Sequence, residues 1–270
     1  MSSSSSSQEP IPPPPSPIRL AILEADTPPA TTHARYNGYR GVFTHLFNRA
    51  LSAPSQQPLS SYLSISAYDV VNHHQPSDYP SLSEVDAILI TGSKHSAFEN
   101  DPWILSLTEF VKKAVTEGDN GRTVKVIGVC FGHQIVGRAL GQTVERNEKG
   151  WEVSVTRVGL TEAGKGLFKG AGEELKIQQM HRDHVVGVPE GAQLLASTNV
   201  CENQGFVIPG KVITVQGHPE FTVDIMEELL ESRRAIGLFN EELYGSGVER
   251  NKVDDGVFIA QAFYRFLTQD

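Results

Sequence analysis

Cys130 lies where a buried strand is expected to meet a helix. It belongs to the stretch VIGVCFGHQIVGRALG (126–141), in which a β-branched apolar run precedes a segment with helical spacing. The flanking residues Gly128 and Gly132 permit a sharp turn that lifts a side chain out of the sheet. The positive end of the helix favours a thiolate, and the N–H of Phe131 can face an oxyanion beside the sulfur. The stretch favours a nucleophile over the alternative, a structural cysteine packed under the helix.

A thiolate nucleophile needs a base and a group that orients the base. Three histidines downstream are candidates: His181, His184 and His218. In ITVQGHPEF, His218 and Glu220 are two residues apart at the end of an apolar run, and strand alternation would place both side chains on one face. The alternative is a pair of surface residues that form a weak ion pair. Taken together with Cys130, the pair predicts a Cys–His–Glu catalytic triad.

The elements that must position these residues alternate between strand and helix over residues 18–141. Near-continuous apolar runs predict strands at 18–24, 62–70, 85–93 and 124–130. Helical spacing follows at 37–51, 101–118 and after Cys130. Apolar strands of this kind indicate a parallel sheet covered on both faces, and therefore an α/β fold of three layers with a mostly parallel central sheet. The second half has shorter strands, and helices are expected at 222–237 and 256–269.

Composition restricts the classes of function. The chain has 270 residues and a formal net charge of −9, with no dense cluster of Lys and Arg, which argues against nucleic acid as a partner. No apolar stretch is long enough for a membrane span. Residues 1–17 are a Ser/Pro-rich segment that we expect to be a disordered tail, and residues 18–270 are expected to form a single domain. Two cysteines and no targeting signal favour a cytoplasmic location.

Two sequence blocks resemble a known family. GVCFGHQIVGRALG and QGHPEF are similar to the two signature blocks of the class I glutamine amidotransferases, which carry a Cys–His–Glu triad, and the resemblance covers residues 18–235. The run ILITGSKHSAFENDPWI is most similar to single-domain, GMP-synthase-like members, which include fungal glutamine amidotransferase-like proteins and plant γ-glutamyl peptidases. The resemblance implies the flavodoxin-like class I glutaminase fold.

The same resemblance implies a reaction. Cys130 would attack the side-chain amide carbon of glutamine, or a γ-glutamyl bond, and form a thioester. His218 would help to generate the thiolate and then protonate the departing nitrogen, while Glu220 orients His218. The oxyanion would lie between the N–H groups of Gly92 and Phe131.

Three further residues are implied to bind substrate. Gln134 matches the position that contacts the amino-acid end of the substrate, and MHRDHV, with His181 and Asp183, matches the loop that closes over that end. Asp183 is expected to pair with the substrate ammonium group. The sequence departs from the family at Arg182, where a glycine is common.

Several functions are compatible with these features. The chain is expected either to hydrolyse glutamine or a γ-glutamyl peptide, or to supply ammonia to a separate synthetase, since little sequence follows HPEF. A silent relative that only binds ligands is disfavoured by the intact triad. An α/β-hydrolase with a Cys nucleophile also has a G-x-C-x-G turn, but its acid precedes the histidine by a long interval. No nucleotide-binding motif is present, so we expect no cofactor and no metal.

Overall fold

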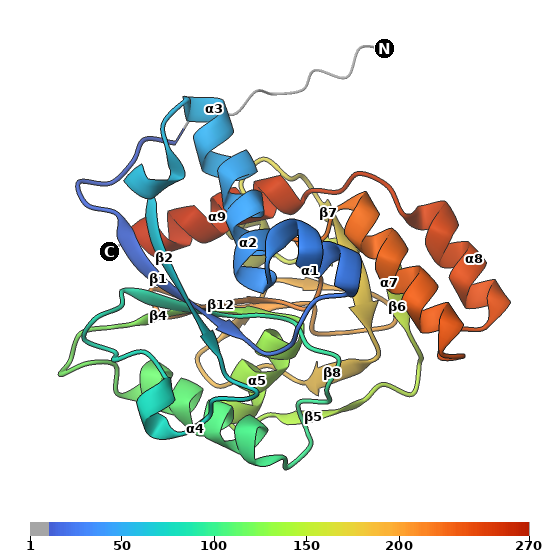
Figure 1. The fold of residues 1–270 in the computed structure, drawn as a ribbon, viewed down its shortest axis with the longest axis horizontal. Helices are drawn as coiled ribbons and strands as arrows, with labels where there is room; N and C mark the ends of the chain where they lie inside the picture. Colours follow the sequence, from blue (N-terminus) through green and yellow to red (C-terminus); the bar gives the residue numbers. More distant parts are fainter. Residues whose placement is uncertain (1–10, 270) are drawn as a thin grey trace.

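A sheet of seven strands organises the computed structural model, which describes residues 11–269 (Figure 1). From one edge to the other, the strands are β2 (Leu63–Asp69), β1 (Ile18–Glu24), β3 (Ala87–Ile90), β4 (Lys125–Val129), β12 (Val212–Val215), β11 (Phe206–Ile208) and β9 (Gln193–Leu194). The first five are parallel to one another, and the last two are antiparallel to their neighbours. The predicted sheet, mostly parallel, is confirmed.

Helices cover both faces of this sheet. Alternate strand residues point to opposite sides, so Leu20 and Ile22 belong to one apolar cluster and Ala21 and Leu23 to the other. The first cluster includes side chains of α2 (Tyr39–Phe47), α7 (Val223–Ala235) and α9 (Gly256–Thr268). The second includes those of α4 (Pro102–Thr116) and α5 (Phe131–Ala139). The three-layer α/β fold is therefore confirmed, as is its flavodoxin-like class.

Two small antiparallel sheets complete the second half of the chain. Three strands form one of them, β10 (Ala196–Ser197), β6 (Glu152–Leu160) and β7 (Glu174–His181). β5 (Thr143–Arg146) pairs with β8 (Asp183–Val186) in the other. The remaining short elements are α3 (Ala53–Ser55), α6 (Glu162–Leu167), a π-helical turn at Asn48–Ser52, and 3₁₀ turns at Leu59–Ser61 and Pro76–Asp78.

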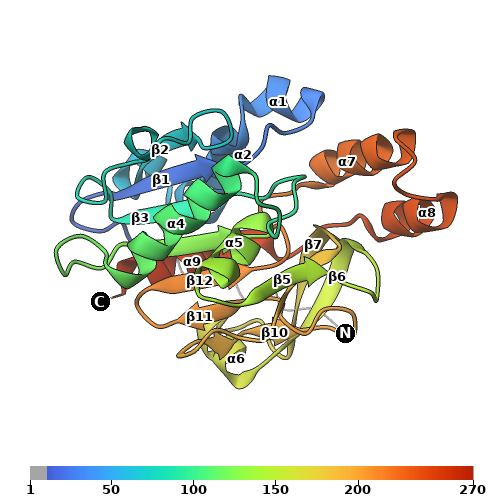
Figure 2. The same cartoon turned by 90° about the horizontal axis from the view of Figure 1, so that it is seen from below.

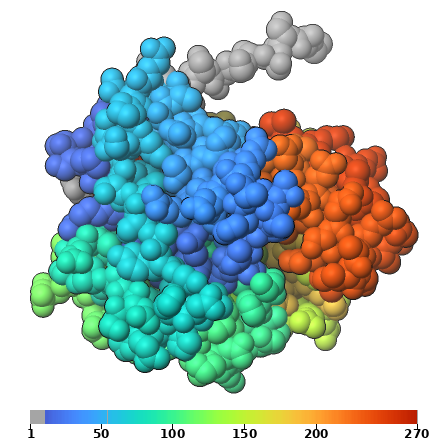
Figure 3. Space-filling view, in the orientation of Figure 1, coloured from blue at the N-terminus to red at the C-terminus, as the bar shows by residue number. Residues whose placement is uncertain are grey.

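The helices that the sequence did not predict include α1 (Ala30–Tyr36) and α8 (Glu241–Arg250). Together with α7, α8 forms a lobe to one side of the sheet, and α1 lies beside α7 (Figures 2 and 3). The Glu228 carboxylate of α7 accepts hydrogen bonds from the N–H groups of Thr31 and Thr32, at 2.7 and 2.9 Å, and from the Thr32 hydroxyl. A side chain from far along the chain therefore stabilises the start of α1.

Most of the predicted tail, residues 1–10 of 1–17, lies outside the described residues. Ile11 packs against the first apolar cluster, and its carbonyl accepts a hydrogen bond from the hydroxyl of Tyr62 at 3.0 Å. The division into a tail and one domain stays a prediction. Within residues 11–269, no helix combines the length and the apolar character that crossing a membrane requires.

Candidate active site

Cys130 occupies a strained turn between β4 and α5. Its backbone has φ 52° and ψ −105°, a conformation that a non-glycine residue rarely adopts and that is typical of a nucleophile elbow. The glycines on either side make the turn possible. A Cβ at Gly132 would lie 2.3 Å from the carbonyl oxygen of Ile90, and a Cβ at Gly128 would lie 2.7 Å from that of Gly132. Cys130 is largely buried, but it lines a cavity.

His218 and Glu220 are in contact, but not for the predicted reason. Nδ1 of His218 donates a hydrogen bond of 2.8 Å to Oε1 of Glu220, and both side chains are buried. β12 ends at Val215, so strand alternation does not bring them together. Instead, the His218 N–H donates to the carbonyl of Gln178 in β7, and Glu220 follows in a turn. The ring of Phe221 stacks on that of His218, with centroids 3.9 Å apart, and holds it in place.

The electrostatics of His218 support a charged imidazole. Burial alone would lower the pKa of His218, but the negative charges of Cys130 and Glu220 and hydrogen bonds to both side chains raise it to about 10. A cationic imidazole beside the sulfur stabilises a thiolate. Cys130, His218 and Glu220 therefore form one connected group.

Gly92, at the end of β3, brings a third segment to the same place. A Cβ at Gly92 would lie only 2.6 Å from Cε1 of His218 and 3.7 Å from Cβ of Cys130. Within residues 11–269, the N–H groups of Gly92 and Phe131 donate no hydrogen bond, and Phe131 is the first residue of α5. Two free backbone donors beside the sulfur are what an oxyanion requires.

The three predicted substrate-binding residues lie together at the cavity. Nε2 of Gln134 donates to the carbonyl of Asp183 at 2.9 Å and to Oε1 of Gln216 at 3.2 Å. Nδ1 of His181 donates to the same Asp183 carbonyl at 3.1 Å. The Asp183 carboxylate is not free, because Nε of Arg146 lies 3.5 Å from its Oδ1. Both the carbonyl and the carboxylate of Asp183 are therefore already engaged by other side chains of the protein.

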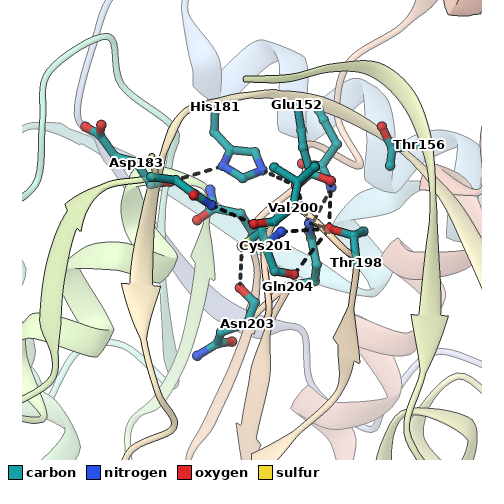
Figure 4. Close-up of polar contacts among 12 residues, drawn as sticks. Glu152, Thr156, His181, Asp183, Thr198, Val200, Cys201, Asn203 and Gln204 are labelled. Carbon is teal, nitrogen blue, oxygen red and sulfur yellow. Dashed lines mark hydrogen bonds and ion pairs between the residues drawn. The ribbon is translucent and has the colours of Figure 1, made fainter. Parts of the chain in front are cut away.

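A second group of Cys, His and Glu side chains includes His181, which lines the cavity (Figure 4). The Glu152 carboxylate accepts hydrogen bonds from Nε2 of His181, the hydroxyl of Thr198 and the amide of Gln204, at 3.0, 2.8 and 2.6 Å. Burial alone would raise the pKa of Glu152, but the hydrogen bonds and the nearby His181 together lower it. The two ring nitrogens of His181 face the Asp183 carbonyl and the Glu152 carboxylate.

Cys201 of this second group is not placed for catalysis. Burial raises the pKa of its thiol to about 12, and Sγ donates to the carbonyl of Asn203. Its exposed fraction is 0%. The Glu152 carboxylate already has three hydrogen-bond donors, so the group is a satisfied network and not a vacant metal site. The sequence did not predict a role for Glu152.

The cavity beside Cys130 has a volume of about 380 Å³, within the range of small-molecule sites. It is lined by Ser93, Lys94, His95, Ser96, Cys130, Gln134, Arg146, Trp151, Met180, His181, Arg182, Asp183, Arg233, Ile236 and Leu238. The sequence analysis did not predict the contribution of α7 and of the turn after it.

Comparisons with known proteins identify the family of the chain. Residues 61–235 match the family model described as glutamine amidotransferase class-I. The chain belongs to the class I glutamine amidotransferase family. A glutamine amidotransferase-like protein of Schizosaccharomyces pombe is 37% identical over 254 residues, covering 93% of this chain and 98% of that protein. Gamma-glutamyl peptidase 4 of Arabidopsis thaliana is 30% identical, covering 81% and 83%.

A solved glutamine amidotransferase of Thermotoga maritima shares the fold of this family member, with a TM-score of 0.69 and 18% identity over 93% of this chain and 99% of that one. Peptidases among the relatives indicate a hydrolytic enzyme, and glutamine or γ-glutamyl substrates fit the family.

Proposed function

We propose that the chain hydrolyses a γ-glutamyl amide, that of glutamine or of a γ-glutamyl peptide, through a thioester on Cys130. The observation that carries the proposal is the elbow at Cys130, which faces a cavity beside a buried His218–Glu220 pair. The relatives named as amidotransferases and peptidases support the same chemistry.

In the first step, the Cys130 thiolate attacks the γ-carbonyl carbon, and the carbonyl electrons move to oxygen. The oxyanion accepts hydrogen bonds from the N–H groups of Gly92 and Phe131. Collapse of this intermediate breaks the C–N bond, and His218 transfers its proton to the departing nitrogen, which leaves as ammonia or an amine. His218, now neutral, accepts a proton from water as the water attacks the thioester, and glutamate and the thiolate are released.

The amino-acid end of the glutamyl group is assigned to the side of the cavity formed by Gln134, His181 and Asp183. The amide nitrogen of Gln134 is occupied by loop contacts, which leaves its oxygen to accept from the substrate ammonium. The paired carboxylate of Asp183 then acts mainly by holding the loop in place.

Release of glutamate from glutamine and from γ-glutamyl peptides by the purified chain tests the proposal, with Cys130→Ala as the control. Turnover that survives in Cys130→Ala would exclude this nucleophile. Activity that appears only when a cell extract is added would support supply of ammonia to a separate synthetase.

Both cysteines are free, which supports the proposed cytoplasmic location.

A further inference from the structure

One wall of the cavity comes from α7 and the turn that follows it. Ile236 and Leu238 line the cavity but are exposed by 68% and 46%, so two large apolar side chains stand at its rim. The ring of Trp151, which also lines the cavity, packs edge-on against Phe239 with centroids 5.1 Å apart. The turn after α7 and Trp151, the residue before β6, therefore bring large apolar side chains to the same cavity as Cys130.

Two guanidinium groups of the cavity lining have no counter-charge among residues 11–269. Arg182 and Arg233 line the cavity, and neither forms an ion pair with another of residues 11–269, whereas Lys94 pairs with Asp26 and Arg146 with Asp183. Nε of Arg182 is also buried without a hydrogen-bond partner. In a chain with a net charge of −9, unpaired arginines in a cavity indicate a site for an anion.

The glutamyl half of the substrate, as assigned above, does not use this wall. Nδ1 of His218 is bound to Glu220, so Nε2 is the atom that can deliver a proton to the departing nitrogen. The glutamyl half is assigned to the Gln134 side. Arg233, Ile236 and Leu238 line the same cavity as Cys130 and belong to α7 and the turn after it. They are therefore part of the lining that is not assigned to the glutamyl half.

Resting on the function proposed above, we propose that this wall is a leaving-group subsite, in which Ile236 and Leu238 contact an apolar side chain and Arg233 binds a carboxylate. The preferred substrate is then a γ-glutamyl peptide whose departing amine carries an apolar side chain and a free carboxylate. Glutamine, which releases ammonia, leaves this subsite unused.

The test compares γ-glutamyl-leucine with its C-terminal amide, which differs only by the missing charge. With the purified full chain, kcat/KM is expected to be about 10-fold to 100-fold higher for the acid, as a charge-assisted hydrogen bond provides. Arg233→Met keeps a long side chain but removes the charge, and should bring the ratio of acid to amide close to one, mainly through KM. Arg234→Met is the matched control, because Arg234 pairs with Glu241 outside the cavity and should keep the wild-type ratio.

The apolar part is tested with γ-glutamyl-glycine. Leu238→Ser should reduce the preference for the leucine over the glycine peptide about fivefold or more. Equal turnover of acid and amide by the wild-type chain, or an unchanged ratio in Arg233→Met, would overturn the subsite while leaving the hydrolase intact.

Calorimetry separates the two proposals further. Cys130→Ala cannot form the thioester, so binding of the acid and the amide can be measured directly. Tighter binding of the acid with no turnover by the wild-type chain would retain the subsite and overturn the proposed hydrolysis. Equal binding of acid and amide would overturn the subsite whatever the turnover.

Discussion

Gly92→Ala tests whether His218 must lie where the structure places it. The new Cβ would lie 2.6 Å from Cε1 of His218, about 0.8 Å closer than the 3.4 Å at which ordinary contact begins. The imidazole has little room to move, because Phe221 stacks on it and Glu220 holds Nδ1 at 2.8 Å. The backbone N–H of residue 92 is kept.

A displacement of this size between base and nucleophile reduces kcat/KM about 100-fold, which corresponds to about 2.7 kcal/mol in the activation free energy. The assay is glutamate release from glutamine, together with the rate at which iodoacetamide alkylates Cys130 at pH 7, which should also fall because the thiolate loses its cationic neighbour. Thermal melting shows whether the variant is folded.

The matched control is Gly245→Ala, since no heavy atom lies within 4 Å of the Cβ that it adds in α8. It should keep full activity and gain a little stability, about 0.5–1 kcal/mol. A Gly92→Ala variant that melts like the wild type and keeps kcat/KM within about twofold would refute the reasoning.

Three further predictions concern the same region. Glu220→Gln removes a charge that raises the pKa of His218, so that pKa should fall from about 10. We expect kcat/KM to drop about 10²-fold to 10⁴-fold and the alkylation of Cys130 to require a higher pH. An unchanged pH profile of alkylation would contradict the role assigned to Glu220. Cys201→Ser keeps a donor for the Asn203 carbonyl and should retain activity within a few-fold, whereas complete loss would make the second Cys–His–Glu group the reaction centre. Burial raises the pKa of Asp254 to about 7 from a reference of 3.8, so ionisation of this group costs the wild type stability as pH rises from about 4 through 7. Asp254→Asn should therefore melt at a higher temperature than the wild type at pH 8 but not at pH 4.5. A difference in melting temperature that is independent of pH would contradict this.

The parts of the fold that the sequence predicted are those with strong local patterns. The apolar runs of β1, β3 and β4 are buried on both faces, and no competing pattern obscures them. α1 was missed because only Thr32 of its residues is buried, so it shows no apolar periodicity, and Glu228 stabilises it from a distant helix. In α8, two glycines and little apolar surface hide the helix.

The candidate site was predicted where one segment carries several of its members. GVCFG and QGHPEF each present adjacent residues in a recognisable order, and Cys130 lies at the turn that its glycines predicted. The contact between His218 and Glu220 was expected for the wrong local reason, since it forms in a turn after β12. Arg233, Ile236 and Leu238 carry no motif, and only the packing of α7 beside the sheet brings them to the cavity.

The backbone conformation of Ser154 explains why the usual alternation of buried and exposed residues along a strand does not predict that Glu152 is buried. With φ 59°, Ser154 interrupts the regular pleat of β6, and Glu152, Val153 and Ser154 are all buried in succession. Glu152 lies directly opposite His181 in the register of β6 and β7, so its carboxylate reaches the ring in the network behind the cavity.

The hydrogen bonds between Glu228 and the start of α1 join the lobe to a helix almost two hundred positions earlier in the chain. Cys130, by contrast, depends on the sheet and on its own flanking glycines. Changes to the length or composition of the stretch after α7 would therefore alter which leaving groups bind, while the turn at Cys130 stays unchanged.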